Sequence, residues 1–350
     1  MAPARPILPL MRAVLLLAFA ALTCASLACR DRDTGTPTPT AALPAATAPD
    51  ATATTSPGTT PTASPSPTST APAGVLDPGT HEHTLESGGR GRPYLVHVPP
   101  GPPGSLPVVM VLHGGGGNAN QVIRSTRFDQ VADENGFIAV FPHGSGRLSD
   151  EFLLTWNSGN CCGYARAQDI DDVAFLRAVV EAVLRDYGAD ARRVYVTGMS
   201  NGGMMSYRLA CEASGVFAAA APVAGALNVD CNPGQPVSLL AIHGTGDRMV
   251  RYEGGEPLEQ VDPASRVDTS VADSVGFFVA HNACAEPPAT TMDGILRYDE
   301  WGSCDQNARV ALYTIEGGVH EWPGDRVATV GREVDASRLI WQFFAALPPR

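Results

Sequence analysis

Hydrophobic runs alternate with amphipathic stretches from about residue 74 to the C-terminus. The runs rich in Val, Ile, Leu, Ala and Phe predict β-strands near residues 92–98, 107–113, 136–142, 193–198, 217–225, 238–244 and 310–318. Several carry hydrophobic residues at consecutive positions, which is typical of parallel strands covered by helices on both faces. The pattern therefore predicts an α/β fold with a mostly parallel sheet.

Residues 169–188 repeat hydrophobic side chains at helical spacing, from Leu176 to Tyr187. This stripe predicts a helix packed against the sheet. Three acidic residues stand at its start, where carboxylates suit the helix dipole: Asp169, Asp171 and Asp172. We interpret them as capping residues in preference to a calcium site. A final helix is predicted over residues 335–347, with Asp335 as its N-cap.

The N-terminus has the pattern of an export signal. Arg5 and Arg12 precede a hydrophobic run over residues 13–22, which is too short to span a bilayer but suits a signal peptide ending at residue 28. Cys29 follows a small residue and is the candidate for lipidation, with simple secretion as the alternative. We expect an extracellular or cell-surface protein that contacts membrane only through this N-terminal lipid.

Residues 29–73 are dominated by Thr, Pro, Ala and Ser, a composition that buries too little surface to fold. This segment is predicted to be a disordered tether. The formal net charge of -12 argues against nucleic acid as a partner. All 24 basic residues are arginine, which excludes lysine-dependent chemistry. Residues 74–350 are left as one folded domain.

The stretch Gly198–Gly202 reads GMSNG and lies between a predicted strand and a predicted helix. This is the setting of a nucleophile elbow, in which small neighbours let strand and helix approach closely while the serine is held outward. Ser200 is therefore the candidate nucleophile, and residues 74–350 are expected to form one catalytic domain with the α/β-hydrolase fold.

The partners of such a serine follow it in the order acid, then histidine. His320 lies in a glycine-bounded loop after the strand at 310–318 and is the candidate base; His243 and His281 are weaker candidates. Asp247 follows the strand at 238–244 and is the candidate acid. The alternative acids, with weaker placement, are Asp262, Asp268 and Asp273.

An oxyanion intermediate needs at least two hydrogen-bond donors. The backbone N–H of Asn201 is one candidate, since it directly follows the nucleophile. The other donors are expected in the glycine run that starts with Gly114 and Gly115. No lysine follows that run, so a phosphate-binding loop is disfavoured.

Together, the motifs LHGGGG, WNSGNCCGYA, DIDDVAF, TGMSNGGMMSYRLAC, HGTGD and EGGVHEWPG resemble those of the secreted polyhydroxybutyrate depolymerase-like esterases, a group that includes feruloyl-esterase-like lipoproteins. The resemblance covers nearly all of residues 80–350. It implies Ser200 as nucleophile, Asp247 as acid and His320 as base, and ester hydrolysis without a metal or organic cofactor. Polymer-degrading members often carry a separate substrate-binding domain that is not visible here, so solid polyester is not the expected substrate.

The cysteines of the folded part suit an exported enzyme. We expect two disulfides, Cys211 with Cys231 and Cys284 with Cys304, while the adjacent Cys161 and Cys162 could pair with each other or elsewhere. No second pair of ligands at metal-binding spacing accompanies them, so zinc is disfavoured.

Trp156 and Trp322 are candidate substrate-binding residues, because aromatic faces suit a phenolic or sugar ring. The alternative is that they only pack beneath the loops that carry the chemistry. The sequence thus predicts a serine esterase acting on hydroxyalkanoate oligomers or on feruloyl or acetyl esters, polymeric or carbohydrate-linked. A peptidase on the same fold and a non-catalytic surface-binding lipoprotein are the alternatives.

Overall fold

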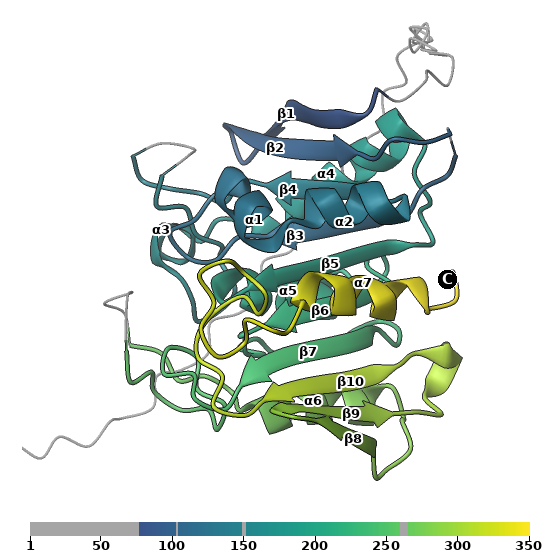
Figure 1. Cartoon of the computed structure of the whole chain (residues 1–350). Coiled ribbons are helices and arrows are strands. Elements are labelled where there is room, and N and C mark those ends of the chain that lie inside the picture. Colours follow the sequence, from purple (N-terminus) through teal and green to yellow (C-terminus); the bar gives the residue numbers. More distant parts are fainter. Residues whose placement is uncertain (1–76, 103, 149–151, 260–264) are drawn as a thin grey trace, which may run out of the picture. The chain divides into compact units, whose positions relative to one another are not determined.

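The structure is a computed structural model that describes residues 77–102, 104–148, 152–259 and 265–350 (Figure 1). The predicted signal peptide, the lipidation candidate Cys29 and the tether over residues 29–73 lie outside the described residues. These three assignments, and the domain boundary at residue 74, stay predictions.

A ten-stranded sheet with the order β1-β2-β4-β3-β5-β6-β7-β10-β9-β8 forms the centre of the fold (Figure 1). Its strands are β1 Gly79–Ser87, β2 Arg90–Val98, β3 Val108–Leu112, β4 Ile138–Pro142, β5 Val194–Met199, β6 Ala219–Val223, β7 Ser238–Gly244, β8 Ala289–Asp293, β9 Leu296–Trp301 and β10 Val310–Ile315. The strands from β4 to β10 in this order run parallel, whereas β1 and β2 at one edge and β9 and β8 at the other are antiparallel. The prediction of a mostly parallel sheet is confirmed.

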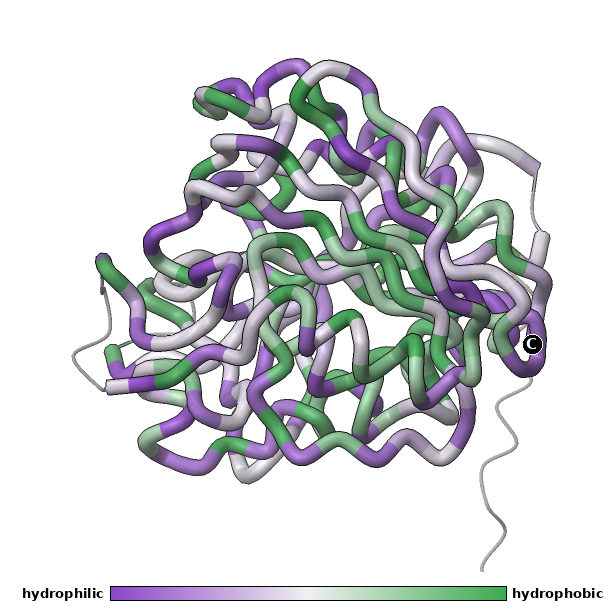
Figure 2. The backbone as a smooth tube through the Cα atoms, turned by 90° about the horizontal axis from the view of Figure 1, so that it is seen from below, coloured by the Kyte–Doolittle hydropathy of each residue, from purple (hydrophilic) through white to green (hydrophobic). Residues whose placement is uncertain are grey.

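Helices cover both faces of this sheet. The helices of the described residues are α1 Ala119–Thr126, α2 Phe128–Asn135, α3 Gly163–Ala167, α4 Asp172–Tyr187, α5 Asn201–Glu212, α6 Val271–His281 and α7 Ala336–Ala345, and all but the short α3 pack on the sheet. One hydrophobic core lies between the sheet and α4, α5 and α6, and a second lies between the opposite face and α1, α2 and α7 (Figure 1). In β3, Met110 belongs to the first core and Val109 and Val111 to the second, which is why the strand is hydrophobic at every position. Figure 2 shows this concentration of hydrophobic residues along the central strands.

The edge strands were not predicted, and their burial gives the reason. Every residue of β8 is exposed, and β1 alternates between exposed and half-buried positions. Such strands form because a neighbour offers backbone hydrogen bonds, so their sequences lack the continuous hydrophobic run of the central strands.

Two of the acidic residues at the start of α4 have different roles in the structure. Asp171 is the N-cap, and its Oδ1 accepts a hydrogen bond from the N–H of Ala174 at 2.9 Å, so the capping prediction is confirmed there. Asp172 instead forms a buried ion pair with Arg92 at 2.6 Å. Asp335 caps α7 as predicted, accepting from the N–H of Arg338 at 3.1 Å.

The predicted disulfides Cys211–Cys231 and Cys284–Cys304 are both present. The first joins the end of α5 to the loop before β7, and the second joins the residues after α6 to those after β9. The adjacent Cys161 and Cys162 pair with each other. Within the described ranges, no helix is long and hydrophobic enough to cross a membrane.

Candidate active site

Ser200 occupies the tight turn between β5 and α5. Its backbone has φ 56° and ψ -121°, a strained conformation for a residue with a side chain. Its N–H donates to the carbonyl of Val223 at 2.9 Å, which ties the turn to β6. The structure therefore gives Ser200 the backbone of a nucleophile elbow.

The two glycines that flank the turn, Gly198 and Gly202, have no room for a side chain. A Cβ on Gly202 would lie 2.5 Å from the carbonyl oxygen of Leu112, and a Cβ on Gly198 would lie 2.7 Å from the carbonyl carbon of Gly202. Both contacts involve backbone atoms, which cannot move aside without shifting β3 or α5. The glycine pattern in the sequence thus reflects close packing of strand against helix.

Asp247 and His320, which are far apart in the sequence, meet at the ends of β7 and β10. Nδ1 of His320 donates to Oδ2 of Asp247 at 2.7 Å, and the carboxylate is fully buried. Oδ1 of Asp247 accepts from the N–H groups of Met249 and Val250 at 2.8 and 2.9 Å, which fixes the carboxylate orientation. The imidazole is therefore held in a defined orientation through its Nδ1.

Burial by itself would raise the pKa of the Asp247 carboxyl, since desolvation disfavours the charged form. The hydrogen bonds from His243 and His320 outweigh this and hold the pKa well below its usual range. His243 Nε2 lies 3.5 Å from Asp247 Oδ2 and 2.7 Å from the carbonyl of Val250. His243 and His320 thus both contact the buried carboxylate, and the His320 side chain is the more exposed of the two, at 11% against 3%.

The glycine run lies against the elbow. A Cβ on Gly114 would be 3.6 Å from Cβ of Ser200, and one on Gly115 would be 3.6 Å from Cβ of Asn201. Within the described part of the chain, the N–H groups of Gly116 and Gly117 are hydrogen-bonded to backbone carbonyls, but those of Gly114 and Gly115 are not. The N–H of Asn201 belongs to the first turn of α5, where it has no partner within the helix. The predicted oxyanion donors Gly114 and Gly115 thus lie next to the residues of the elbow.

His113, which precedes the glycines, was not singled out in the sequence. It is completely buried; its Nδ1 donates to the carbonyl of Gly114 at 2.8 Å, and its Nε2 accepts from the N–H of Gly144 at 2.9 Å. Burial lowers its pKa to about 3, so the ring is neutral. His113 therefore fixes the backbone of the glycine loop.

The assignment of Trp156 and Trp322 to substrate binding is corrected by the structure. Their exposed fractions are 0% and 3%. Nε1 of Trp156 donates to the carbonyl of His113 at 3.0 Å, and Nε1 of Trp322 donates to Oγ of Ser337 at 3.2 Å. Both rings pack beneath the loops because their large hydrophobic surface is worth more in the core than at a water-filled cleft.

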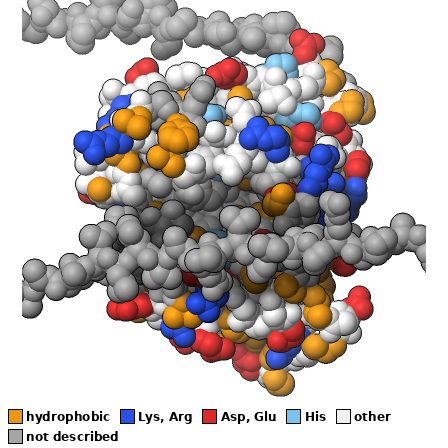
Figure 3. All heavy atoms as spheres, turned by 60° about the vertical axis from the view of Figure 1, so that its left-hand side comes forward, with side chains coloured by type: hydrophobic (Ala, Val, Ile, Leu, Met, Phe, Trp, Pro, Cys, Tyr) orange, Lys and Arg blue, Asp and Glu red, His pale blue; other side chains and the backbone are white. Residues whose placement is uncertain are grey.

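A pocket of about 240 Å³ opens beside the elbow. Its walls are mostly hydrophobic or sulfur-containing, and it is lined by Gly115, Gly116, Leu153, Thr155, Cys161, Cys162, Gly163, Tyr164, Ser200, Asn201, Met204, Met249, Glu259 and Arg266. Sequence motifs alone did not point to Met204, Met249 or Arg266. Figure 3 views the molecule from the side of these loops, where hydrophobic and charged side chains both reach the surface.

The other candidate residues are engaged elsewhere. Oδ1 of Asp268 lies 2.9 Å from Nε of Arg266 in an ion pair. At the start of α6, Oδ2 of Asp273 accepts a hydrogen bond from Oγ of Ser270 at 2.7 Å. His281 stacks on Phe277 in α6. Asp262 lies outside the described residues. In the part of the chain that is described, no group of three His, Cys, Asp or Glu side chains is placed to hold a metal ion.

The fold and the elbow define the class as an α/β-hydrolase. The architecture resembles that of the acetyl xylan esterase from Aspergillus awamori, with a TM-score of 0.51 and 16% identity over 75% of this chain and 99% of that one. Residues 93–274 match the family described as esterase PHB depolymerase. The protein belongs to this family and is a carboxylic ester hydrolase.

Named relatives agree with this assignment. The chain is 30% identical over 279 residues to NocK of Nocardia uniformis subsp. tsuyamanensis, a protein named as an esterase, with 73% of this chain and 79% of that protein covered. It is 29% identical over 263 residues to feruloyl esterase C of Emericella nidulans, with 73% and 84% covered. It is 30% identical over 238 residues to feruloyl esterase B of Piromyces equi, covering 65% of this chain but only 42% of that protein.

Proposed function

We propose that this protein is an exported serine esterase that cleaves carboxylic esters through Ser200, His320 and Asp247. The observation that carries the proposal is the 2.7 Å hydrogen bond between His320 and the buried Asp247, made across 73 residues of sequence. A histidine oriented by a buried carboxylate at the ends of two parallel strands is the arrangement that a serine base requires.

In the proposed reaction, Nε2 of His320 accepts the hydroxyl proton as Oγ of Ser200 attacks the ester carbonyl. The carbonyl oxygen becomes an oxyanion, which the N–H groups of Asn201, Gly114 and Gly115 stabilise. His320 then protonates the leaving alcohol and afterwards activates the water that releases the acid. Asp247 keeps the imidazole in the required tautomer and balances its positive charge.

The hydroxyalkanoate, feruloyl and acetyl esters expected from the sequence belong to this proposal as substrates. The names of the relatives from Emericella and Piromyces, both feruloyl esterases, support an aromatic acyl group. An extracellular site of action and anchoring through lipid on Cys29 complete the proposal.

The proposal is tested with p-nitrophenyl esters and a fluorophosphonate probe. Wild type is expected to show a burst of p-nitrophenol and to be labelled, and Ser200→Ala is expected to lose both while unfolding at the same urea concentration. Ser125→Ala, at a half-buried position on α1, is the matched control. Turnover by Ser200→Ala would contradict the assignment of Ser200 as the nucleophile. If wild type cleaves peptides but no esters, the protein is better described as a peptidase. Absence of labelling and turnover in wild type would favour a binding protein.

A further inference from the structure

The pocket beside Ser200 lies on the acyl side of the proposed reaction. Its lining contains Ser200 and the candidate oxyanion donors at Gly115 and Asn201, but His320 is not among the described residues that line it. The leaving alcohol must lie within reach of His320, which protonates it. The pocket without His320 therefore holds the acyl part of the substrate.

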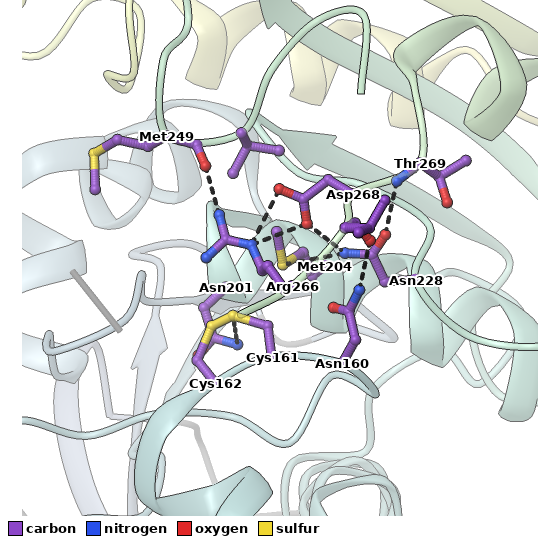
Figure 4. Close-up of polar contacts among 12 residues, drawn as sticks. Asn160, Cys161, Cys162, Asn201, Met204, Asn228, Met249, Arg266, Asp268 and Thr269 are labelled. Atoms are coloured by element: carbon purple, nitrogen blue, oxygen red, sulfur yellow. Dashed lines mark hydrogen bonds and ion pairs between the residues drawn. A yellow bond between two sulfur atoms is a disulfide. The ribbon is translucent and has the colours of Figure 1, made fainter. Parts of the chain in front are cut away.

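Arg266 is the one cationic side chain among the residues that line this pocket. Its side chain is 11% exposed, and its Nε lies 2.9 and 3.0 Å from the two oxygens of Asp268, which is fully buried. One terminal nitrogen, Nη2, donates to the carbonyl of Met249. Asp268 is held in turn by Nδ2 of Asn228 at 2.8 Å. The guanidinium is thus fixed before any ligand arrives (Figure 4).

The remaining nitrogen, Nη1, has no hydrogen bond to any described residue, and in Figure 4 it points away from Asp268. Arg266 is one of the residues that line the pocket, so this nitrogen is the part of the guanidinium left to meet a ligand there. A loop contact keeps this arrangement in place: Nδ2 of Asn160 donates to the carbonyl of Val267 at 2.8 Å. Arg266 therefore adds one fixed N–H donor to the pocket, besides the candidate oxyanion donors at Gly115 and Asn201. Apart from Ser200 and Asn201, the other polar side chains of the lining are Thr155, Tyr164 and Glu259.

The pairing with Asp268 decides which ligand suits this donor. The charge of Arg266 is already balanced, and the Nε edge that would grip a carboxylate with two parallel hydrogen bonds is occupied. A single donor with balanced charge suits a neutral oxygen better than a second anion.

We propose that Nη1 of Arg266 donates a hydrogen bond to an oxygen substituent of the acyl group, and so selects acyl groups that carry a hydrogen-bond acceptor beyond the ester carbonyl. This inference rests on the proposed esterase function. Both 3-hydroxyalkanoyl and hydroxycinnamoyl groups have such an oxygen, whereas plain alkanoyl and cinnamoyl groups lack it.

The test uses pairs of methyl esters. 3-Hydroxybutyrate against butyrate, and p-coumarate against cinnamate, differ only in that oxygen, whereas ferulate against cinnamate differs by a methoxy group as well. A hydrogen bond from a charged donor predicts that wild type prefers the oxygenated member of at least one pair by about 10- to 100-fold in kcat/KM. The pair that shows the preference identifies the source of the oxygen. A ratio close to one in every pair overturns the inference.

The variant is Arg266→Met combined with Asp268→Asn, which avoids leaving a buried carboxylate unpaired and keeps an acceptor for Asn228. Its preference for the oxygenated ester should disappear, because kcat/KM falls more for the oxygenated member of the pair than for the unsubstituted one. Arg297→Met with Asp299→Asn removes a similar pair on β9 and should keep the wild-type ratio. Equal loss on both members of a pair would show that Arg266 only supports the pocket, and would overturn the inference.

Failure of the inference can be told apart from failure of the proposed function. Ester cleavage without discrimination rejects the role of Arg266 but leaves the esterase intact. If no ester is cleaved, calorimetry measures the affinity of the pocket of Ser200→Ala for the methyl esters themselves: methyl ferulate, methyl cinnamate, methyl 3-hydroxybutyrate and methyl butyrate. Tighter binding of an oxygenated member, lost in the Arg266 and Asp268 variant, supports the inference, and equal binding overturns it.

Discussion

The side chain of Asn201 is hydrogen-bonded to both backbone groups of Trp156. Its Oδ1 accepts from the N–H of Trp156 at 2.7 Å, and its Nδ2 donates to the carbonyl of the same residue at 2.9 Å. Nδ2 also lies 3.1 Å from Oγ of Ser158. The residue after the candidate nucleophile thus fastens the loop that carries one wall of the pocket, so its side chain and its backbone N–H have separate roles.

Replacement of Asn201 by Ala is expected to lower the free energy of unfolding by about 1–3 kcal/mol, because it leaves buried backbone groups of Trp156 unpaired. Urea denaturation measures this change. Asn135→Ala at the exposed end of α2, where the amide donates to the carbonyl of Val131, is the control and should change stability by less than about 0.5 kcal/mol. Equal effects at the two positions would contradict the role of Asn201.

The change Asp247→Asn should reduce kcat by about 10³- to 10⁴-fold, because the amide can hold the imidazole in the wrong tautomer. The loop itself should survive, since an amide oxygen can still accept from the N–H groups of Met249 and Val250. Steady-state kinetics on a p-nitrophenyl ester measures the loss. Asp186→Asn, which changes an exposed ion pair with Arg185, is the control and should leave kcat unchanged. A loss below about tenfold for Asp247→Asn would remove the acid from the proposed triad.

Gly202→Ala should inactivate or unfold the protein, because its Cβ would overlap the carbonyl oxygens of Leu112 and His113 at 2.5 and 2.6 Å. The same change at Gly276, inside α6, meets no atom within 4 Å. Gly276→Ala should stabilise the protein by about 0.5–1 kcal/mol, since alanine has the higher helix propensity. Thermal unfolding and activity, measured side by side, check both. A stable and active Gly202→Ala variant would mean that the turn is looser than described.

Removal of the Cys211–Cys231 disulfide by serine substitution at both positions should cost about 3 kcal/mol, since the bond closes a loop with a sequence separation of 20. The Cys284–Cys304 disulfide has the same separation and should contribute a similar amount on the chain-entropy model. Urea denaturation of the two double variants compares them. Unchanged stability on removing either bond would show that its loop is already ordered in the unfolded chain.

Acid should destabilise the protein through His113. Its folded-state pKa of about 3 lies below the unfolded value, so below about pH 6.5 the unfolded state binds a proton that the folded state excludes. Stability is therefore lost as pH falls from about 6.5 toward 3, at up to roughly 1.4 kcal/mol per pH unit. His113→Gln has no titrating ring and should show a shallower loss in urea titrations at pH 6, 5 and 4, about 1 kcal/mol per unit less steep. Parallel pH profiles would contradict this account.

The central strands and most of the candidate site could be predicted because each had a strong local signal. Consecutive hydrophobic residues in β3 and β7 marked strands buried on both faces, and the glycines around Ser200 marked a crowded turn. Loop length and order along the chain were enough to select Asp247 and His320 as partners. The disulfide pairs Cys211–Cys231 and Cys284–Cys304 were also predicted correctly from their equal spacing.

Other features had no local signal. The exposed edge strand β8 forms only because β9 pairs with it, and the direction in which Trp156 and Trp322 face depends on the helices and loops packed around them. Nothing in the sequence around Arg266 marks it as a pocket residue, because Asp268 and the carbonyl of Met249 hold it there only in the folded protein.

By itself, the sequence determined which segments are buried, where the backbone must turn tightly and which side chains can carry the chemistry, because these follow from neighbouring residue types. The tertiary structure alone decided the distance at which Asp247 meets His320, and that Asn201 meets Trp156 and Arg266 reaches the pocket wall. Such contacts depend on strand order and on the packing of separate loops, and no short stretch of chain encodes either.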